Sequence, residues 1–282
     1  MIHPIGSAWS VRPRTIPARC VLFGLLAFAC MGAEPPPSLN GRFERVDIAR
    51  LAGGFRPAFV IESLNTGERW FFNGEQCREP LAPCSTFKIF NTMAGLDAGV
   101  LRDEHSVKKW DGSKQFFPSW ERDHDLASAI RYSVVWYYQE VAREIGAARM
   151  QAYLDKAGYG NRDISGGIDR FWLGNSLKIS AEEQVDFLAR FYRGQLPFSR
   201  TACETTQKIL VLNRFENGTF SGKTGSDWKA GEWLLGWFVG HVSRDGEAYV
   251  FALNILGEDA RGQLARPLAE SILREAGLLP PQ

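Results

Sequence analysis

Histidine and cysteine are scarce in this chain. Its 282 residues contain four histidines and five cysteines, without any Cys-x-x-Cys pair. The histidines lie far apart along the sequence, at His3, His105, His124 and His241. Because zinc is usually held by clusters of these residue types, we expect no metal site and no metal cofactor. The sequence also lacks a Gly-x-Ser-x-Gly motif, which argues against an ordinary esterase.

The chain also has no marked excess of positive or negative charge. The chain has 33 Lys and Arg against 32 Asp and Glu, a formal net charge of +1. Domains that bind nucleic acids usually carry a basic surplus on one face, and acidic tails are equally visible in composition. We therefore expect no nucleic-acid partner.

No apolar run looks long enough to span a bilayer comfortably. The short run at residues 21–29 follows arginines at positions 12, 14 and 19 and leads into two small-residue cleavage motifs. This order predicts a signal peptide over residues 1–33, cleaved after Ala29 or Ala33, and a periplasmic location. A lipid anchor at Cys30 is a lesser alternative because bulky Phe28 precedes it. The proline-rich stretch that follows opens a single domain, 34–282, with no membrane span in the mature chain.

Export would leave three cysteines in the mature chain, Cys77, Cys84 and Cys203. An exported protein can keep a disulfide, and a bond between Cys77 and Cys84 would close a short loop just before Ser85. The alternative is that all three are buried thiols. The sequence leaves both interpretations open.

Apolar spacing predicts strands near both ends and helices between them. Residues 59–64 and 68–72 flank an Asn-Thr-Gly turn and indicate a β-hairpin. Helical spacing dominates from about 85 to 200, most clearly at 86–101, 126–131, 134–145, 147–157 and 181–191. Ser180 and Glu183 form a capping box for the last of these. Strand signals return at 218–223, 233–242 and 248–255, before a helix at 263–278. We expect an α/β fold of the α+β type, an antiparallel sheet with flanking N- and C-terminal helices and an inserted helical region.

The most informative pair of residues is Ser85 and Lys88. Positions three apart share one face of a helix, so the lysine can reach the serine hydroxyl. A serine becomes a useful nucleophile only when a neighbouring base takes its proton. The chain contains a second Ser-x-x-Lys at Ser106 and Lys109, in a polar stretch, which we interpret as a solvated surface. Spacing alone therefore does not define the site.

Two further motifs supply hydroxyl and amine groups elsewhere in the chain. Ser133-Val134-Val135 opens a predicted helix, and Lys223-Thr224-Gly225 ends a predicted strand. In a strand, Lys223 and Gly225 point to one face and Thr224 to the other. The glycine also allows close approach to the backbone.

These motifs together give the chain a resemblance to the class D, or oxacillinase-type, serine β-lactamases. The matching segments follow the family's order, namely Ser85-Thr86-Phe87-Lys88, Ser133-Val134-Val135, Tyr159-Gly160-Asn161, Phe171-Trp172-Leu173 and Lys223-Thr224-Gly225. The resemblance covers about residues 43–279. It implies a β-lactamase/transpeptidase-like fold and hydrolysis of the β-lactam ring of small penicillin-type substrates, conferring antibiotic resistance.

The resemblance also implies roles for individual residues. Ser85 would form the acyl-enzyme, and Lys88, modified by carbon dioxide to N6-carboxylysine, would be the general base for acylation and deacylation. Burial should lower the pKa of that lysine and so permit the modification. Ser133 and Lys223 would relay protons, and Val135, Trp172 and Leu173 would surround the carbamate. The backbone N–H groups of Ser85 and Ser226 would form the oxyanion hole. Substrate would be bound by Thr224, Gly225 and one of two arginines, Arg266 or Arg261.

Two other functions fit the same fold. One is a penicillin sensor domain that is acylated without turnover, and the other is a penicillin-binding peptidase. The single cleavable signal and Trp172 beside the lysine favour the hydrolase. The substrate spectrum and the oligomeric state do not follow from the sequence.

Overall fold

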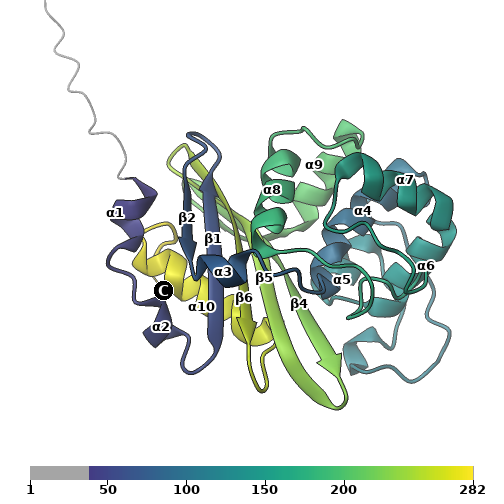
Figure 1. Ribbon diagram of the computed structural model, residues 1–282. Helices are drawn as coiled ribbons and strands as arrows, with labels where there is room; N and C mark the ends of the chain where they lie inside the picture. Colours follow the sequence, from purple (N-terminus) through teal and green to yellow (C-terminus); the bar gives the residue numbers. More distant parts are fainter. Residues whose placement is uncertain (1–37, 282) are drawn as a thin grey trace, which may run out of the picture. The chain divides into compact units, whose positions relative to one another are not determined.

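The computed structural model describes residues 38–281, and the expected signal peptide and its cleavage sites lie outside this range. A six-stranded antiparallel sheet with the order β2-β1-β6-β5-β4-β3 forms the centre of this unit (Figure 1). Its strands are β1 (Arg56–Ser63), β2 (Arg69–Phe72), β3 (Val211–Phe215), β4 (Gly218–Lys229), β5 (Glu232–Arg244) and β6 (Glu247–Leu256). Strand β1 pairs with β6 from the other end of the chain, so the sheet is built from both ends as the sequence predicts.

Both faces of the sheet are buried. Along β1, Phe59 and Ile61 pack into one core while Ala58 and Val60 pack into the other, following the two-residue period of a strand. Three helices cover the first face (Figure 1): α1 (Leu39–Phe43), α2 (Ile48–Leu51) and α10 (Gly262–Glu275). These are the expected flanking helices.

The inserted helical region covers the opposite face (Figure 1). After α3 (Gly74–Cys77) and the 3-10 helix η1 (Cys84–Phe87), it contains α4 (Lys88–Asp97), the short η2 (Pro118–Trp120), α5 (Leu126–Arg131), α6 (Val135–Ile145), α7 (Ala147–Ala157), α8 (Ala181–Tyr192) and α9 (Arg200–Ile209). Helix α4 is buried without interruption from Lys88 to Gly95. A helix buried all round is central to its domain, and α4 places the side chain of Lys88 in the protein interior.

Most predicted elements are confirmed, with local corrections. Helices α5 and α7 begin and end where expected, and the capping box of Ser180 and Glu183 is present. The predicted helix at 86–101 is instead η1 followed by a shorter α4. Strand β4 continues to Lys229, so Lys223-Thr224-Gly225 lies within a strand and does not end it. Helix α9 and strand β3 were not predicted.

Of the two interpretations that the sequence leaves open, the structure contradicts the disulfide between Cys77 and Cys84. Within residues 38–281, Cys77, Cys84 and Cys203 are free and buried. Cys77 Sγ lies 3.3 Å from the carbonyl oxygen of Phe72, and burial raises the pKa of this thiol to about 12. The alternative of three buried thiols therefore holds. In the same range no helix is long and apolar enough to cross a membrane.

Candidate active site

Ser85 and Lys88 are in direct contact. The structure places Ser85 in η1 and Lys88 at the start of α4, with Nζ of the lysine 2.7 Å from Oγ of the serine. Lys88 is completely buried. Burial lowers the pKa of its amine well below the ordinary value, and the nearby positive charge of Lys223 lowers it further. The result is an amine with a lowered pKa against a serine hydroxyl, which is the arrangement that a nucleophilic serine needs.

The turn that carries Ser85 is held from several sides. Its neighbour Cys84 has a φ of 50°, which is a strained value for a non-glycine residue. Thr86 Oγ1 donates to the carbonyl of Pro83 at 2.7 Å and accepts from Gln184 Nε2 at 2.8 Å. These contacts fix the nucleophile between the sheet and α8.

Gly225 lets strand β4 approach this turn. A Cβ at position 225 would lie 2.9 Å from the carbonyl oxygen of Pro83 and 3.1 Å from Cγ2 of Thr86. Real Cβ atoms essentially never approach another atom that closely, so the sequence requires glycine here. Because Lys223 lies two residues earlier on the same face of β4, this close approach also sets its distance from Ser133.

Ser133 and Lys223 form a second hydroxyl–amine pair. Lys223 Nζ donates to Ser133 Oγ at 3.0 Å and to the carbonyl of Thr224 at 2.9 Å. Ser133 precedes α6 and has a φ of 57°, another strained backbone position. Burial lowers the pKa of Lys223 to about 7. This lysine can therefore be charged or neutral near neutral pH.

Trp172 is buried beside the catalytic pair. Its ring centroid lies 5.6 Å from that of Phe87, and the side chain is fully enclosed. The indole Nε1 is buried and makes no hydrogen bond with any described residue. A buried donor without a partner is costly, so this N–H fits an acceptor that the protein atoms do not supply. Val135 and Leu173 are half-buried and line the cleft.

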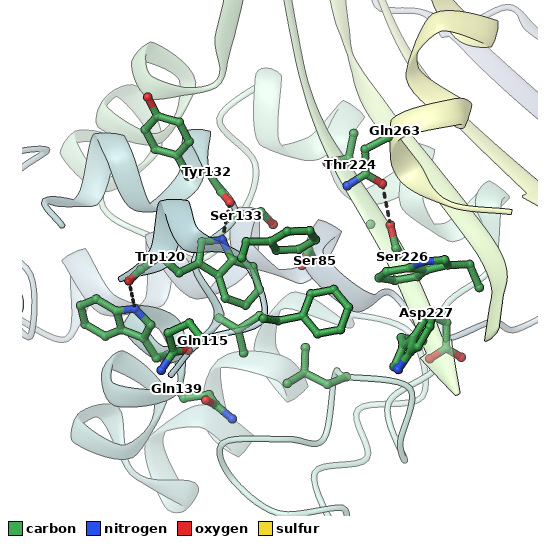
Figure 2. Close-up of a pocket in the computed structure, with 18 residues that line it drawn as sticks. Ser85, Gln115, Trp120, Tyr132, Ser133, Gln139, Thr224, Ser226, Asp227 and Gln263 are labelled. Atoms are coloured by element: carbon green, nitrogen blue, oxygen red, sulfur yellow. Dashed lines mark hydrogen bonds between the residues drawn. The ribbon is translucent and has the colours of Figure 1, made fainter. Parts of the chain in front are cut away.

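Four of the five motifs contribute residues to the cleft. A cavity of about 330 Å³ is lined by Ser85, Ser133, Val135, Leu173, Thr224, Gly225 and Ser226 (Figure 2). A second cavity of about 800 Å³ includes Lys223, Thr224 and Arg266. Arg261, the alternative arginine, lines neither cavity and contacts Asp259 instead. The geometry therefore favours Arg266 as the arginine beside the cleft.

Several residues of the cleft escaped the sequence analysis. Six aromatic side chains come from a loop, from η2 and α6, and from the ends of β4 and β5, namely Phe116, Phe117, Trp120, Trp136, Trp228 and Trp233. Polar Gln139, Gln263 and Asp227 join them (Figure 2). In the sequence, only the many aromatic residues of segments 110–120 and 228–233 point to these side chains, and composition does not show that they line the cleft. Trp120 is fixed by its indole N–H, which donates to the carbonyl of Tyr132 at 2.9 Å.

Asn161 acts as a clamp for the loop that carries Trp172. Its side chain donates to the carbonyl of Ser176 and accepts from the backbone N–H of Lys178, both at 2.9 Å. A Cβ on neighbouring Gly160 would collide with the carbonyl of Lys178. The Tyr159-Gly160-Asn161 motif thus has a structural task in positioning this loop.

The second Ser-x-x-Lys copy is a surface feature. Ser106 Oγ accepts from the backbone N–H of Arg102 at 2.8 Å, and Lys109, 81% exposed, pairs with Asp123. Neither group lines the cleft. Among residues 38–281, no group of three or more His, Cys, Asp or Glu could hold a metal ion.

Comparison with known proteins agrees with this geometry. The family model of the penicillin-binding protein transpeptidase domain matches residues 57–274. The probable β-lactamase YbxI of Bacillus subtilis is 40% identical over 78% of this chain and 81% of its own length. β-Lactamase OXA-48 of Klebsiella pneumoniae is 38% identical, over 78% of this chain and 83% of its own.

Solved structures give the same result. A class D β-lactamase from Bacillus subtilis superposes with a TM-score of 0.80 at 37% identity, covering 85% of this chain and 99% of its own. The regulatory protein BlaR1 of Bacillus licheniformis is 35% identical over 79% of this chain, but over only 37% of its own length. Fold and site therefore define a serine enzyme of the penicillin-binding type. More narrowly, the chain belongs to the class D β-lactamases.

Proposed function

We propose that this protein hydrolyses the β-lactam ring of penicillin-type antibiotics through an acyl-enzyme on Ser85, and so confers resistance. One observation carries the proposal: the hydroxyl-bearing residues Ser85 and Ser133 line one cleft, and each serine contacts a buried lysine, Lys88 or Lys223, whose pKa is lowered. A lysine amine must be deprotonated to accept a proton, and burial favours that form because it disfavours the charged ammonium.

Acylation follows from the positions of these groups. The general base carried by Lys88 accepts the proton of Ser85 Oγ as that oxygen attacks the lactam carbonyl. Ser85 and Ser226 line the cavity. Their backbone N–H groups would bind the developing oxyanion, a donor of this kind being worth about 3–4 kcal/mol in the transition state. When the C–N bond breaks, the hydroxyl of Ser133 protonates the leaving nitrogen and recovers its proton from Lys223.

We also propose that Lys88 carries a carbamate formed with carbon dioxide. The neutral amine can form this group, and Trp172 Nε1, buried and without a partner among the described residues, would hold one of its oxygens. Val135 and Leu173 would shield it from bulk water. Such a carbamate supplies an oxygen base beside Ser85 for both acylation and deacylation.

The substrate carboxylate would be bound at the other side of Ser85. Thr224 and Arg266 line the second cavity together with Lys223. Arginine binds carboxylates through two parallel hydrogen bonds, and Lys223 adds positive potential when protonated. Gly225 keeps the strand backbone close to the nucleophile, as its contact with Pro83 requires.

Turnover of a chromogenic cephalosporin tests the hydrolase. We expect continuous hydrolysis by the wild-type protein and none by Ser85→Ala. A single stoichiometric burst without turnover would overturn the proposal and favour a sensor, a result that the similarity to BlaR1 makes worth measuring. Absence of any acylation would exclude both functions.

We further propose that the protein is exported to the periplasm with removal of a signal peptide within residues 1–33, cleaved after Ala29 or Ala33. The support is the order of arginines, apolar run and small residues in the sequence. Fractionation of cells expressing the full chain, followed by N-terminal sequencing, tests it. A mature chain beginning at Cys30 or at Glu34 is expected, and an uncleaved chain in the cytoplasm would contradict it.

A further inference from the structure

The cavity around Ser85 has an unusual composition for a site that binds an anionic substrate. Seven aromatic side chains line it, and Asp227 is its single residue with a formal charge at neutral pH. No lysine or arginine lines this cavity. An aromatic chamber with one carboxylate is the environment that favours a cation.

The carboxylate of Asp227 is not compensated by the protein. Asp227 lies on β4 two residues after Gly225 and faces Gly174 of the loop that carries Trp172. The side chain is half-buried, and no described residue forms an ion pair or a side-chain hydrogen bond with it. Its negative charge is therefore available to a ligand in the cavity. Because the site is partly removed from water, that charge acts more strongly than one on an open surface.

Three of the aromatic rings present faces and edges at the mouth of the same cavity. Phe116 lies 5.9 Å from Trp228 and 6.0 Å from Trp233, measured between ring centroids, and the two tryptophans are 4.7 Å apart. Phe116 is 57% exposed and Trp228 46% exposed. Exposed indole and phenyl faces attract organic cations, with tryptophan the strongest of the three aromatic types.

The two cavities have opposite character. The second cavity is lined by four basic residues, Arg131, Lys208, Lys223 and Arg266, and by one acidic residue, Glu104. Thr224 lines both cavities, so they adjoin at this residue. A β-lactam that acylates Ser85 with its ring carboxylate toward Arg266 would direct its acylamino side chain into the aromatic cavity. The ammonium end of a zwitterionic substrate would then face Asp227.

We propose that the aromatic cavity, with Asp227 as its negative pole, selects β-lactams that carry an ammonium group on the acyl side chain. Asp227 is a specificity-determining residue in this scheme and takes no part in bond breaking. The inference rests on the proposed hydrolase function and names a substrate class for it.

Ampicillin and benzylpenicillin test the proposal, because they differ only by the α-ammonium group. The quantity to measure is kcat/KM for each, at about pH 6, where an α-amino group is protonated. In Asp227→Asn, we expect the ratio of ampicillin to benzylpenicillin to fall about fivefold to tenfold, mainly through KM for ampicillin. Glu232→Gln is the matched control, since it removes an equal charge at the exposed start of β5, outside the cavity, and should leave the ratio unchanged.

A second variant keeps the proposal testable even if Asp227→Asn does not fold. Trp228→Leu retains an apolar side chain but removes an aromatic face, and it should lower the same ratio about threefold. An unchanged ratio in both variants would overturn the proposal. Equal falls in Asp227→Asn and Glu232→Gln would also overturn it, because they would reflect long-range charge alone. Failure to hydrolyse either penicillin would overturn the hydrolase function itself, and the inference with it.

Discussion

At the residue scale, catalysis depends on keeping two lysines inside the protein. Lysine is almost never fully buried without a partner, yet Lys88 is fully enclosed and Lys223 is 5% exposed. Each amine contacts a serine hydroxyl and no carboxylate. Burying these two amines costs stability, and the same burial lowers the pKa of each of them.

Lys88→Ala should abolish turnover. General-base catalysis contributes about 10²–10⁴ in rate, and we expect kcat/KM for a chromogenic cephalosporin to fall by at least about 10³. Lys109→Ala is the matched control, because it belongs to the surface copy of the same motif and is exposed. Retained activity in Lys88→Ala would mean that another group is the base.

Trp172→Phe should make the enzyme dependent on bicarbonate. The change preserves an aromatic ring against Phe87 and removes the unpartnered N–H. We expect a slow deacylation step, partly restored by added bicarbonate, and a weaker carbamate signal from ¹³C-bicarbonate in NMR spectra. Trp237→Phe removes another buried indole donor, whose partner is the carbonyl of Ala82. This control should lose stability without gaining a bicarbonate dependence; the same behaviour in both variants would contradict the role of Trp172.

At the scale of elements, the site depends on how closely β4 packs against η1. Gly225→Ala would place a methyl group 2.9 Å from the carbonyl of Pro83. Because both contacting partners include backbone atoms, the strand must move, and Lys223 would move with it. We expect a loss of about 10²-fold or more in kcat, since small displacements of catalytic groups are that costly.

The matched control for this change is Gly246→Ala. Gly246 lies in the turn between β5 and β6 with a φ of 85°, and nothing lies within 4 Å of an added Cβ. It should cost about 1 kcal/mol of stability through backbone strain while leaving kcat unchanged. Denaturation and steady-state kinetics on both variants separate the two effects; equal kinetic losses would contradict the argument.

The elements also show what the sequence could and could not predict. Helices α5 and α7 were predictable because apolar residues recur at helical spacing. Helix α9 buries only Ala202, Cys203 and Thr206, and the middle of β3 is exposed, so neither carries a clear apolar signal. The motifs identified Ser85, Lys88, Ser133 and Lys223 in advance. Asp227 was missed because β4 was expected to end before it, and the aromatic rings of the cleft lie on segments whose paths do not follow from local spacing.

At the scale of the whole molecule, the buried lysine Lys223 should make stability depend on pH. Its pKa is about 7 in the folded protein against 10.5 ordinarily, so between these values the unfolded chain binds more protons and the free energy of unfolding rises with pH. Above about pH 9, the raised pKa values of Cys77 and Cys84 act in the opposite direction. The pH dependence of the unfolding free energy therefore reports on Lys223 between about pH 7.5 and 8.5.

Denaturant unfolding across this window measures the effect. Lys223→Met should reduce the slope of unfolding free energy by up to about 1.4 kcal/mol per pH unit, the value for one proton. Lys229→Met, at the exposed end of β4, is the control and should follow the wild type. A slope that is the same in all three proteins would show that Lys223 is charged in the folded state.

The pairing of β1 with β6 determines when the protein becomes active during its synthesis. Strand β1 can pair with β6 only after β6 has been synthesised, because Phe59 lies opposite Leu253. In the same way, Gly225 can pack against the turn that carries Ser85 only after β4 has been synthesised. A nascent chain therefore leaves the ribosome with its first hairpin lacking its inner partner until nearly all residues have been added. A premature stop codon before Glu247 should consequently give no partly active product, however much of the motif sequence it retains.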